Sequence, residues 1–343
     1  MKSDQDLPHY LRGLIDYVRK ESRTVVGLHS GTSADGPTAL IEKFSGSGRS
    51  TQFEIIDWED YDYQGPLKER IFDIFSRQSS SVDRVAQADN ALGEYFAGIA
   101  ERIVARAGLT MTDIDLIVSS GHVCNQVIDG QRDDHSWLGD RAVTAFLDMG
   151  AGAFMAERTG VTTLSNLRQR DIAAGGLGVP TVSYGDWALF THEEHNRALH
   201  NIGGIANPTV LPADGSLEDM FAFDSGPGNM IMDAFVGWIS NSEIAFDDGG
   251  RLAAAGTVND GLLAEFMSHP FIQQRPPKLQ HASFSVMSIR AAFSTRTGSW
   301  DWPTLICLPR RQRSRQTASH TRTKNMFCLE LQLTRFSWQA AVH

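Results

Sequence analysis

A short apolar strand, a glycine-rich turn and a second strand follow one another twice in this sequence. The first hairpin of this kind joins 24–28 to 38–41, and the second joins 200–205 to 208–211. Each hairpin is followed by further strand and helix patterns. This repetition predicts an α/β fold made of two related lobes, with a ligand-binding cleft between them.

The spacing of apolar residues predicts the other elements of the chain. The pattern over 82–107 is the most regular, because Leu92, Phe96 and Ile103 share one helix face. Gly108 follows this pattern as the expected C-cap. Further helices are expected over 6–20, 151–159, 230–240 and 258–267, and further strands over 52–58, 115–119 and 161–165.

The sequence changes in character after about residue 280. From 281 onward, nine Lys or Arg residues stand against two acidic residues, and no apolar period is present. We expect this basic segment to be disordered or aberrant, as if translated in another reading frame, and to make few core contacts. The rest is expected to form an N-terminal helical extension at 1–23, a first lobe at 24–165 and a partial second lobe at 166–280.

Charge and cysteine content limit the partners and the compartment. The formal net charge of −10 opposes binding to nucleic acid, which leaves the basic tail as a minor alternative. Cys124, Cys307 and Cys328 show neither metal-site spacing nor a disulfide framework, which favours a reducing compartment. No signal-peptide pattern is present, and no stretch approaches the roughly 18 apolar residues of a membrane span. We therefore expect a cytoplasmic protein with no membrane or nucleic-acid partner.

The segment RQRDIAAGGLGVP at 168–180 brings one carboxylate, that of Asp171, to a run of small residues. Its polar start and glycine-rich end disfavour a packed helix or a central strand and favour a loop that lies against a ligand. Asp171 is the candidate catalytic residue, and Arg168, Gly175 and Gly176 are candidate substrate contacts. The alternative is a structural turn without a ligand.

Three glycine-bearing segments are suited to phosphate binding. Segment 31–36 offers hydroxyl and backbone N–H groups, and its Asp35 is a candidate ligand of hydrated Mg²⁺. The turn at 203–204 gives room beside a phosphate, and 224–229 opens a helix whose N–H groups favour an anion. The alternative for 31–36 is a polar hairpin turn, for 203–204 a tight turn, and for 224–229 a helix cap. The candidate nucleotide-binding residues are Gly31, Thr32, Ser33, Ala34, Asp35, Gly36, Pro37, Thr38, Gly203, Gly204, Asn207, Asp224, Gly226, Gly228 and Asn229.

His122 is a further candidate substrate contact. The strand pattern at 115–119 is followed by Gly121 and His122, where we expect the strand to end. Cleft residues often stand at strand ends, and the alternative for this histidine is a structural role.

Five segments, in order along 24–278, together resemble the motifs of the anhydro-N-acetylmuramic acid kinases, a group that includes levoglucosan kinase. They are GLHSGTSADGPTAL, AERTGVTTLSNLRQRDIAAGGLGVP, HNIGGIANPTVL, FDSGPGNMIMDAF and HPFIQQRPPK. The resemblance implies a two-lobed actin/hexokinase-like (ASKHA) fold, ATP with Mg²⁺, and a 1,6-anhydro sugar as acceptor. It also implies that Asp171 is the general base. That base takes a proton from the water that attacks the anomeric carbon, while the freed 6-oxygen accepts the γ-phosphoryl group.

The chain departs from the family motifs at several places. The family motif HGQT is replaced by His122-Val-Cys-Asn, and LQIGDG by LDMGAG at 147–152. After Lys278, no adenosine-binding segment is recognisable, so the second lobe is expected to be incomplete. The alternatives to an anhydro-N-acetylmuramic acid kinase are a levoglucosan kinase and an inactive sugar- or nucleotide-binding remnant. Whether the chain forms a homodimer is left open.

Overall fold

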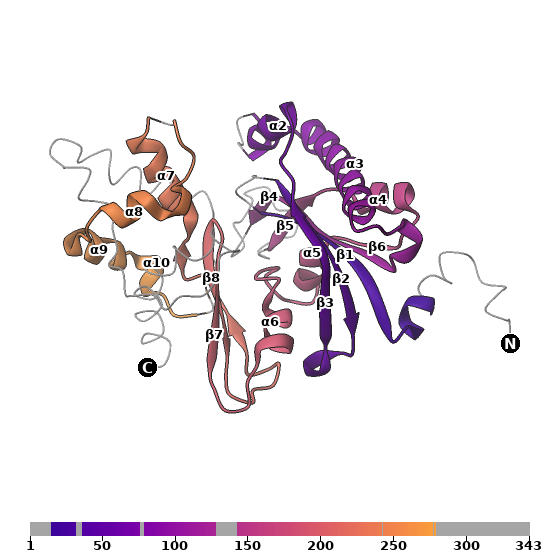
Figure 1. Cartoon of the computed structure of the whole chain (residues 1–343). Helices are drawn as coiled ribbons and strands as arrows, with labels where there is room; N and C mark the ends of the chain where they lie inside the picture. Colours follow the sequence, from indigo (N-terminus) through magenta and orange to yellow (C-terminus); the bar gives the residue numbers. More distant parts are fainter. Residues whose placement is uncertain are drawn as a thin grey trace. The chain divides into compact units, whose positions relative to one another are not determined.

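The chain divides into two compact units, Met1–Glu193 and Glu194–His343. A computed structural model describes residues 15–31, 36–75, 79–127, 143–241, 243–276 and 278 (Figure 1). The division falls later than the lobe boundary expected after 165. The assignment of actin-like lobes, and of a cleft between them, stays a prediction. The basic segment after 280 and most of the expected helix at 6–20 lie outside the described residues, and 15–19 are helical.

The first unit contains a mixed sheet. The strands are paired in the order β3-β2-β1-β4-β5, and β6 pairs with the first part of β4. β1 and β6 run parallel to β4, whereas the other pairs are antiparallel, including the predicted hairpin of β1 and β2. The strands are β1 (Ser22–Ser30), β2 (Pro37–Ser45), β3 (Gln52–Asp60), β4 (Leu116–Val127), β5 (Ala145–Met149) and β6 (Thr163–Leu164).

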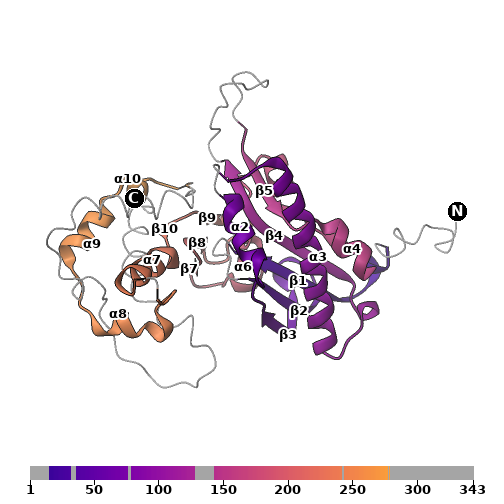
Figure 2. The same cartoon turned by 90° about the horizontal axis from the view of Figure 1, so that it is seen from above.

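Helices cover both faces of this sheet: Figure 1 shows α3 and α4 on one side and α5 and α6 on the other, and Figure 2 shows α3 and α4 together on the same side. The predicted long helix is confirmed as α3, whose N-cap Ser81 accepts a hydrogen bond from the Arg84 N–H. Its apolar face, with Phe96 and Ile103, is buried in one core cluster with residues of β1, β2, β4 and β5. The helices of this unit include α2 (Pro66–Phe75), α3 (Val82–Arg106), α4 (Gly152–Thr159), α5 (Leu167–Ala173) and α6 (Ser183–Phe190).

Two expectations about the first unit are wrong. The strand expected at 115–119 continues to Val127, so His122 lies inside β4 and not at its end. β5 pairs with the second part of β4, from His122 to Val127. Gly121, directly before this part, has a left-handed φ of +66°. The polar half of the expected loop at 168–180 is helical, because α5 extends to Ala173 before the glycine-rich turn begins.

The second unit contains a small antiparallel sheet and several helices. The predicted hairpin is confirmed as β7 and β8, with β9 and β10 both paired to β8. In the described part of the chain, no helix is long and apolar enough to cross a membrane. The elements are β7 (Arg197–Ile202), β8 (Ile205–Leu211), β9 (Phe221–Ala222), β10 (Gly226–Pro227), α7 (Asn229–Ile239), α8 (Arg251–Ala255), α9 (Asp260–Met267) and α10 (Pro270–Gln273).

Candidate functional site

The carboxylate of Asp171 lies on the surface, near the end of α5, and is held by the turn that follows. The Gly178 N–H donates a hydrogen bond to Asp171 Oδ2 over 2.7 Å, and the Gly176 N–H donates to the Asp171 carbonyl oxygen over 3.0 Å. The other carboxylate oxygen, Oδ1, accepts no hydrogen bond from the described residues. One oxygen is thus fixed by the backbone, while the other is available to a water molecule or a ligand.

The glycines of this turn are required by its geometry. Gly175 and Gly178 have φ of +96° and +82°, in the left-handed region that glycine adopts without strain. A Cβ atom at Gly176 would lie 2.1 Å from Asp171 Oδ2, far inside van der Waals contact. The turn therefore wraps closely around the carboxylate and fixes its direction.

Replacing Gly176 by alanine is expected to lower kcat by about 100-fold for the sugar phosphorylation that the family resemblance implies, because a displacement of about 1 Å at a reacting group has an effect of this size. The added Cβ would force the Asp171 carboxylate away from the Gly178 N–H. Steady-state kinetics of purified protein would measure the change. Gly185→Ala in α6 is the matched control, since no atom lies within 4 Å of the Cβ it would add. Equal kcat for both variants would contradict the geometry.

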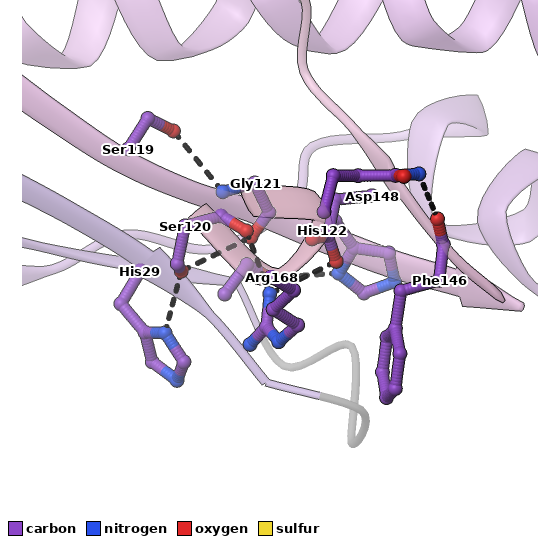
Figure 3. Close-up of polar contacts among 10 residues, drawn as sticks. His29, Ser119, Ser120, Gly121, His122, Phe146, Asp148 and Arg168 are labelled. Carbon is purple, nitrogen blue, oxygen red and sulfur yellow. Dashed lines mark hydrogen bonds and ion pairs between the residues drawn. The ribbon is translucent and has the colours of Figure 1, made fainter. Parts of the chain in front are cut away.

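The buried side of α5 is anchored to β4 and β5 by polar contacts (Figure 3). Arg168 is only 5% exposed, and its Nη1 donates to Asp148 Oδ1 and to the Ser120 carbonyl oxygen, each over 2.9 Å. The Gln169 amide also donates to the Phe146 carbonyl oxygen. Burial raises the pKa of the Asp148 carboxyl, and the Arg168 guanidinium opposes that rise. Sequence reasoning missed Asp148, although it lies within the altered segment at 147–152.

His122 lies in a buried polar cluster beside this ion pair. Its Nδ1 is 2.8 Å from Ser30 Oγ, which is in turn 2.7 Å from the Tyr63 hydroxyl. His29 Nδ1 is hydrogen-bonded to Ser120 Oγ over 2.7 Å (Figure 3). The pKa of His122 is lowered to about 4, mainly by burial and to a lesser extent by the nearby His29 and Arg168. The imidazole is therefore neutral at physiological pH.

The lowered pKa of His122 predicts a loss of stability in acid. An unfolded histidine binds a proton below its ordinary pKa of 6.5, whereas folded His122 does so only near 4. The unfolded state thus binds more protons in this window. The folding constant is expected to fall by up to about tenfold per pH unit as pH drops from 6.5 to 4. Urea unfolding at a series of pH values measures this slope.

The matched variant for this measurement is His122→Asn, which keeps a polar atom near the place of Nδ1 but does not titrate. Its free energy of unfolding should depend less steeply on pH over the same window. Groups with other shifted pKa values, such as His29 and Asp148, are present in both proteins and cancel in the comparison. Identical slopes would show that His122 does not titrate as its burial requires.

The candidate phosphate residues of the first unit are described only at the two ends of segment 31–36. Thr32, Ser33, Ala34 and Asp35 lie outside the described residues, whereas Gly31 and Gly36 lie within them. Gly36 has φ of +142°, and a Cβ atom there would lie 1.7 Å from the Tyr61 carbonyl oxygen. Pro37 and Thr38 begin β2, and the Thr38 hydroxyl donates to Asp60 Oδ1 over 2.6 Å. Only glycine, which has no side chain, therefore fits at position 36, directly before β2.

In the second unit, two glycine-bearing segments that the sequence presents separately lie in contact. The Gly228 N–H donates to the Gly204 carbonyl oxygen over 2.8 Å, and the Asn229 N–H donates to the Gly203 carbonyl oxygen over 2.9 Å. A Cβ atom at Gly228 would lie 2.2 Å from the Gly203 carbonyl oxygen. The turn between β7 and β8 is therefore bound directly to the start of α7.

Asp224, Gly226 and Asn207 lie close to this contact. Asp224 is buried, and its N–H donates to the carbonyl oxygen of Lys278 over 2.9 Å. The Lys278 ammonium donates to two carbonyl oxygens of α10, and burial lowers its pKa, an effect that Asp224 opposes. Gly226 pairs with Ala206 of β8. The buried Asn207 Oδ1 accepts no hydrogen bond from the described residues and so remains available to a donor.

No described set of side chains forms a metal site. Among the residues described, no group of three or more His, Cys, Asp or Glu could hold a metal ion. Asp35, the expected Mg²⁺ ligand, lies outside them. Its role, like that of the other candidate site residues, stays a prediction.

Comparison with known proteins identifies the family. The sequence model of the anhydro-N-acetylmuramic acid kinases matches residues 23–289. The anhydro-N-acetylmuramic acid kinase of Caldanaerobacter subterraneus subsp. tengcongensis is 41% identical over 269 residues, which cover 77% of this chain and 66% of the relative. The enzyme of the same name from Francisella tularensis subsp. novicida is 35% identical over 258 residues, covering 75% and 65%. The chain spans about two thirds of the length of these curated relatives. It belongs to the anhydro-N-acetylmuramic acid kinase family.

Proposed function

We propose that this chain is an ATP-dependent kinase that opens a 1,6-anhydro sugar, anhydro-N-acetylmuramic acid, and phosphorylates its 6-oxygen. The observation that carries the proposal is the Asp171 carboxylate, which the Gly178 N–H fixes at Oδ2 and which is open at Oδ1. Family membership and the printed names of the relatives support the choice of sugar. The mixed α/β fold of the first unit agrees with one lobe of a two-lobed actin/hexokinase-like kinase.

In the proposed reaction, Asp171 acts as a general base. Its Oδ1 takes one proton from water, while the water oxygen bonds to the anomeric carbon. The bond between that carbon and the 6-oxygen breaks, and its electron pair stays on the 6-oxygen. That oxygen then attacks the γ-phosphorus, and the bond from this phosphorus to the bridging oxygen breaks, so that ADP leaves. The proton on Asp171 returns to solvent after product release.

The glycine-bearing segments of both units are assigned to the nucleotide. The N–H groups of Gly228 and Asn229 are already used by the turn at 203–204, so they are not free for a phosphate. The next N–H groups, in the first turn of α7, have no intrahelical acceptor and suit an anion. Asp35 is proposed as the Mg²⁺ ligand, and Mg²⁺ would neutralise charge on the phosphates.

The candidate sugar contacts divide into two groups. Gly176 lies against the Asp171 carboxylate and Gly175 precedes it in the same turn, and we assign both to the sugar side of the turn. His122 is fully buried and Arg168 is 5% exposed, so we assign both to the support of α5 and β4. This assignment replaces direct contact with the sugar for these two side chains.

The test is an assay of ADP release with anhydro-N-acetylmuramic acid, levoglucosan and glucose, joined to a calorimetric titration with Mg-ATP. We expect turnover of the first sugar, no turnover of glucose, and a product with a free reducing end, because water opens the anhydro ring. Turnover of levoglucosan in preference would shift the assignment to that sugar. Sugar binding without any ADP release would support an inactive remnant and overturn the proposal.

A further inference from the structure

Helix α5, which carries Asp171, is too short to be stable alone. It has seven residues, and no side chain caps its N-terminus, where Asn166 has a left-handed φ of +57°. Isolated helices shorter than about 12 residues are marginal in water. Contacts with the sheet must therefore set where α5 lies.

Among the polar contacts that join α5 to β4 and β5, the Asp148–Arg168 ion pair is the one between two charged side chains. Arg168 bridges β5 and β4, because one nitrogen donates to both Asp148 Oδ1 and the Ser120 carbonyl oxygen. The guanidinium carbon also lies 5.9 Å from the centre of the Phe146 ring. Asp148 comes from the end of β5, so the pair ties α5 to a strand of the sheet (Figure 3).

The pair is better suited to fix a position than to add stability. Both side chains are buried, and Asp148 Oδ2 and Arg168 Nε have no hydrogen-bond partner among the described residues. Burying two charges with incomplete hydrogen bonding offsets most of their attraction. A directional contact of this kind still specifies one geometry for the helix. Asp171 follows Arg168 by three residues, about one helical turn, and moves with it.

We propose that Asp148 is a positioning residue for the general base: through Arg168 it sets the place of α5, and thereby the direction of the Asp171 carboxylate. The inference rests on the proposed function for the role of Asp171. The Gly178 N–H reports the position of the carboxylate directly, because it donates to Asp171 Oδ2. A signal from that amide does not depend on any activity of the protein.

The variant Asp148→Asn removes the charge while keeping the side-chain shape. We expect kcat to fall at least tenfold, with KM for Mg-ATP changed less than twofold. In the Asp171→Asn background, the same substitution should change the residual rate less than twofold, because the group it positions is already gone. Hydrogen exchange of the Gly178 amide should become at least tenfold faster in Asp148→Asn. Asp57→Asn, which breaks the exposed Arg106 pair of the same unit, is the control and should change neither value.

Unchanged kcat and unchanged Gly178 exchange in Asp148→Asn would overturn the proposal, as would equal effects of that substitution in both backgrounds. If Asp148→Asn does not fold, Arg168→Lys replaces it, since lysine keeps the charge but lacks the guanidinium geometry. The same measurements of kcat and of Gly178 exchange then decide whether the proposal holds. A wild-type chain without kinase activity would defeat the proposed function alone. Gly178 exchange would still test whether Asp148 sets the carboxylate position.

Discussion

In the proposed reaction, the Asp171→Asn variant is expected to lose sugar phosphorylation by a factor of about 10²–10⁴, the usual effect of removing a general base. Asparagine has the shape of aspartate, and its amide oxygen can still accept the Gly178 N–H. The amide cannot take a proton from water at neutral pH. The loss should therefore appear in kcat, while the turn around residue 171 keeps its structure.

Binding of Mg-ATP should be nearly unchanged in this variant, because the groups assigned to the nucleotide lie in other segments. Calorimetric titration measures that binding, and ADP release with the anhydro sugar measures turnover. Asp73→Asn is the matched control, since Asp73 is an exposed carboxylate on α2, in the same unit. Full activity of Asp171→Asn would show that another group accepts the proton.

Elements fixed by local pattern were predicted from the sequence. Two extended segments around a glycine-rich turn identified β1 and β2, and the alternation of apolar residues identified β3. The helical period identified α3 with its face of Leu92 and Phe96. In the second unit, the hairpin of β7 and β8 was recognised because its strands are close in sequence. For these elements, neighbouring residues carry most of the information.

Elements held by distant partners were not predicted. The second half of β4 pairs with β5, and the segment between the two is long, so neither strand is evident alone. The polar start of α5 favoured a loop. The contacts that stabilise the helix come from Asp148 and Phe146, twenty or more residues earlier. A sequence pattern does not show contacts of this range.

The candidate site shows the same division. Asp171 and its glycines were identified because carboxylate and turn are adjacent in sequence. The contact of the 203–204 turn with Gly228, and the role of Asp148 under α5, depend on folding and were missed. The residue types were evident in both cases, but their partners were not.

Phe96→Ala is expected to destabilise the first unit by about 3–5 kcal/mol, the usual cost of removing a buried phenylalanine side chain. Phe96 is 1% exposed and belongs to the core cluster that joins α3 to the sheet. Its ring packs directly on Gly150, where a Cβ atom would lie 2.6 Å from the ring carbon Cε2. Alanine would leave a cavity between α3 and the end of β5, which the backbone at Gly150 cannot fill.

Thermal and urea unfolding of Phe96→Ala measure this loss, and a domain of this size should show a fall in Tm of roughly 6–20 °C. Val82→Ala is the control on the same helix: Val82 is 86% exposed, so its truncation should change the free energy of unfolding by less than about 0.5 kcal/mol. Asp148 lies two residues before Gly150, at the end of β5. The cavity should therefore also speed exchange of the Gly178 amide, because the strand that anchors α5 loses its support. A stable Phe96→Ala variant with native Gly178 exchange would mean that α3 does not support β5 through this ring.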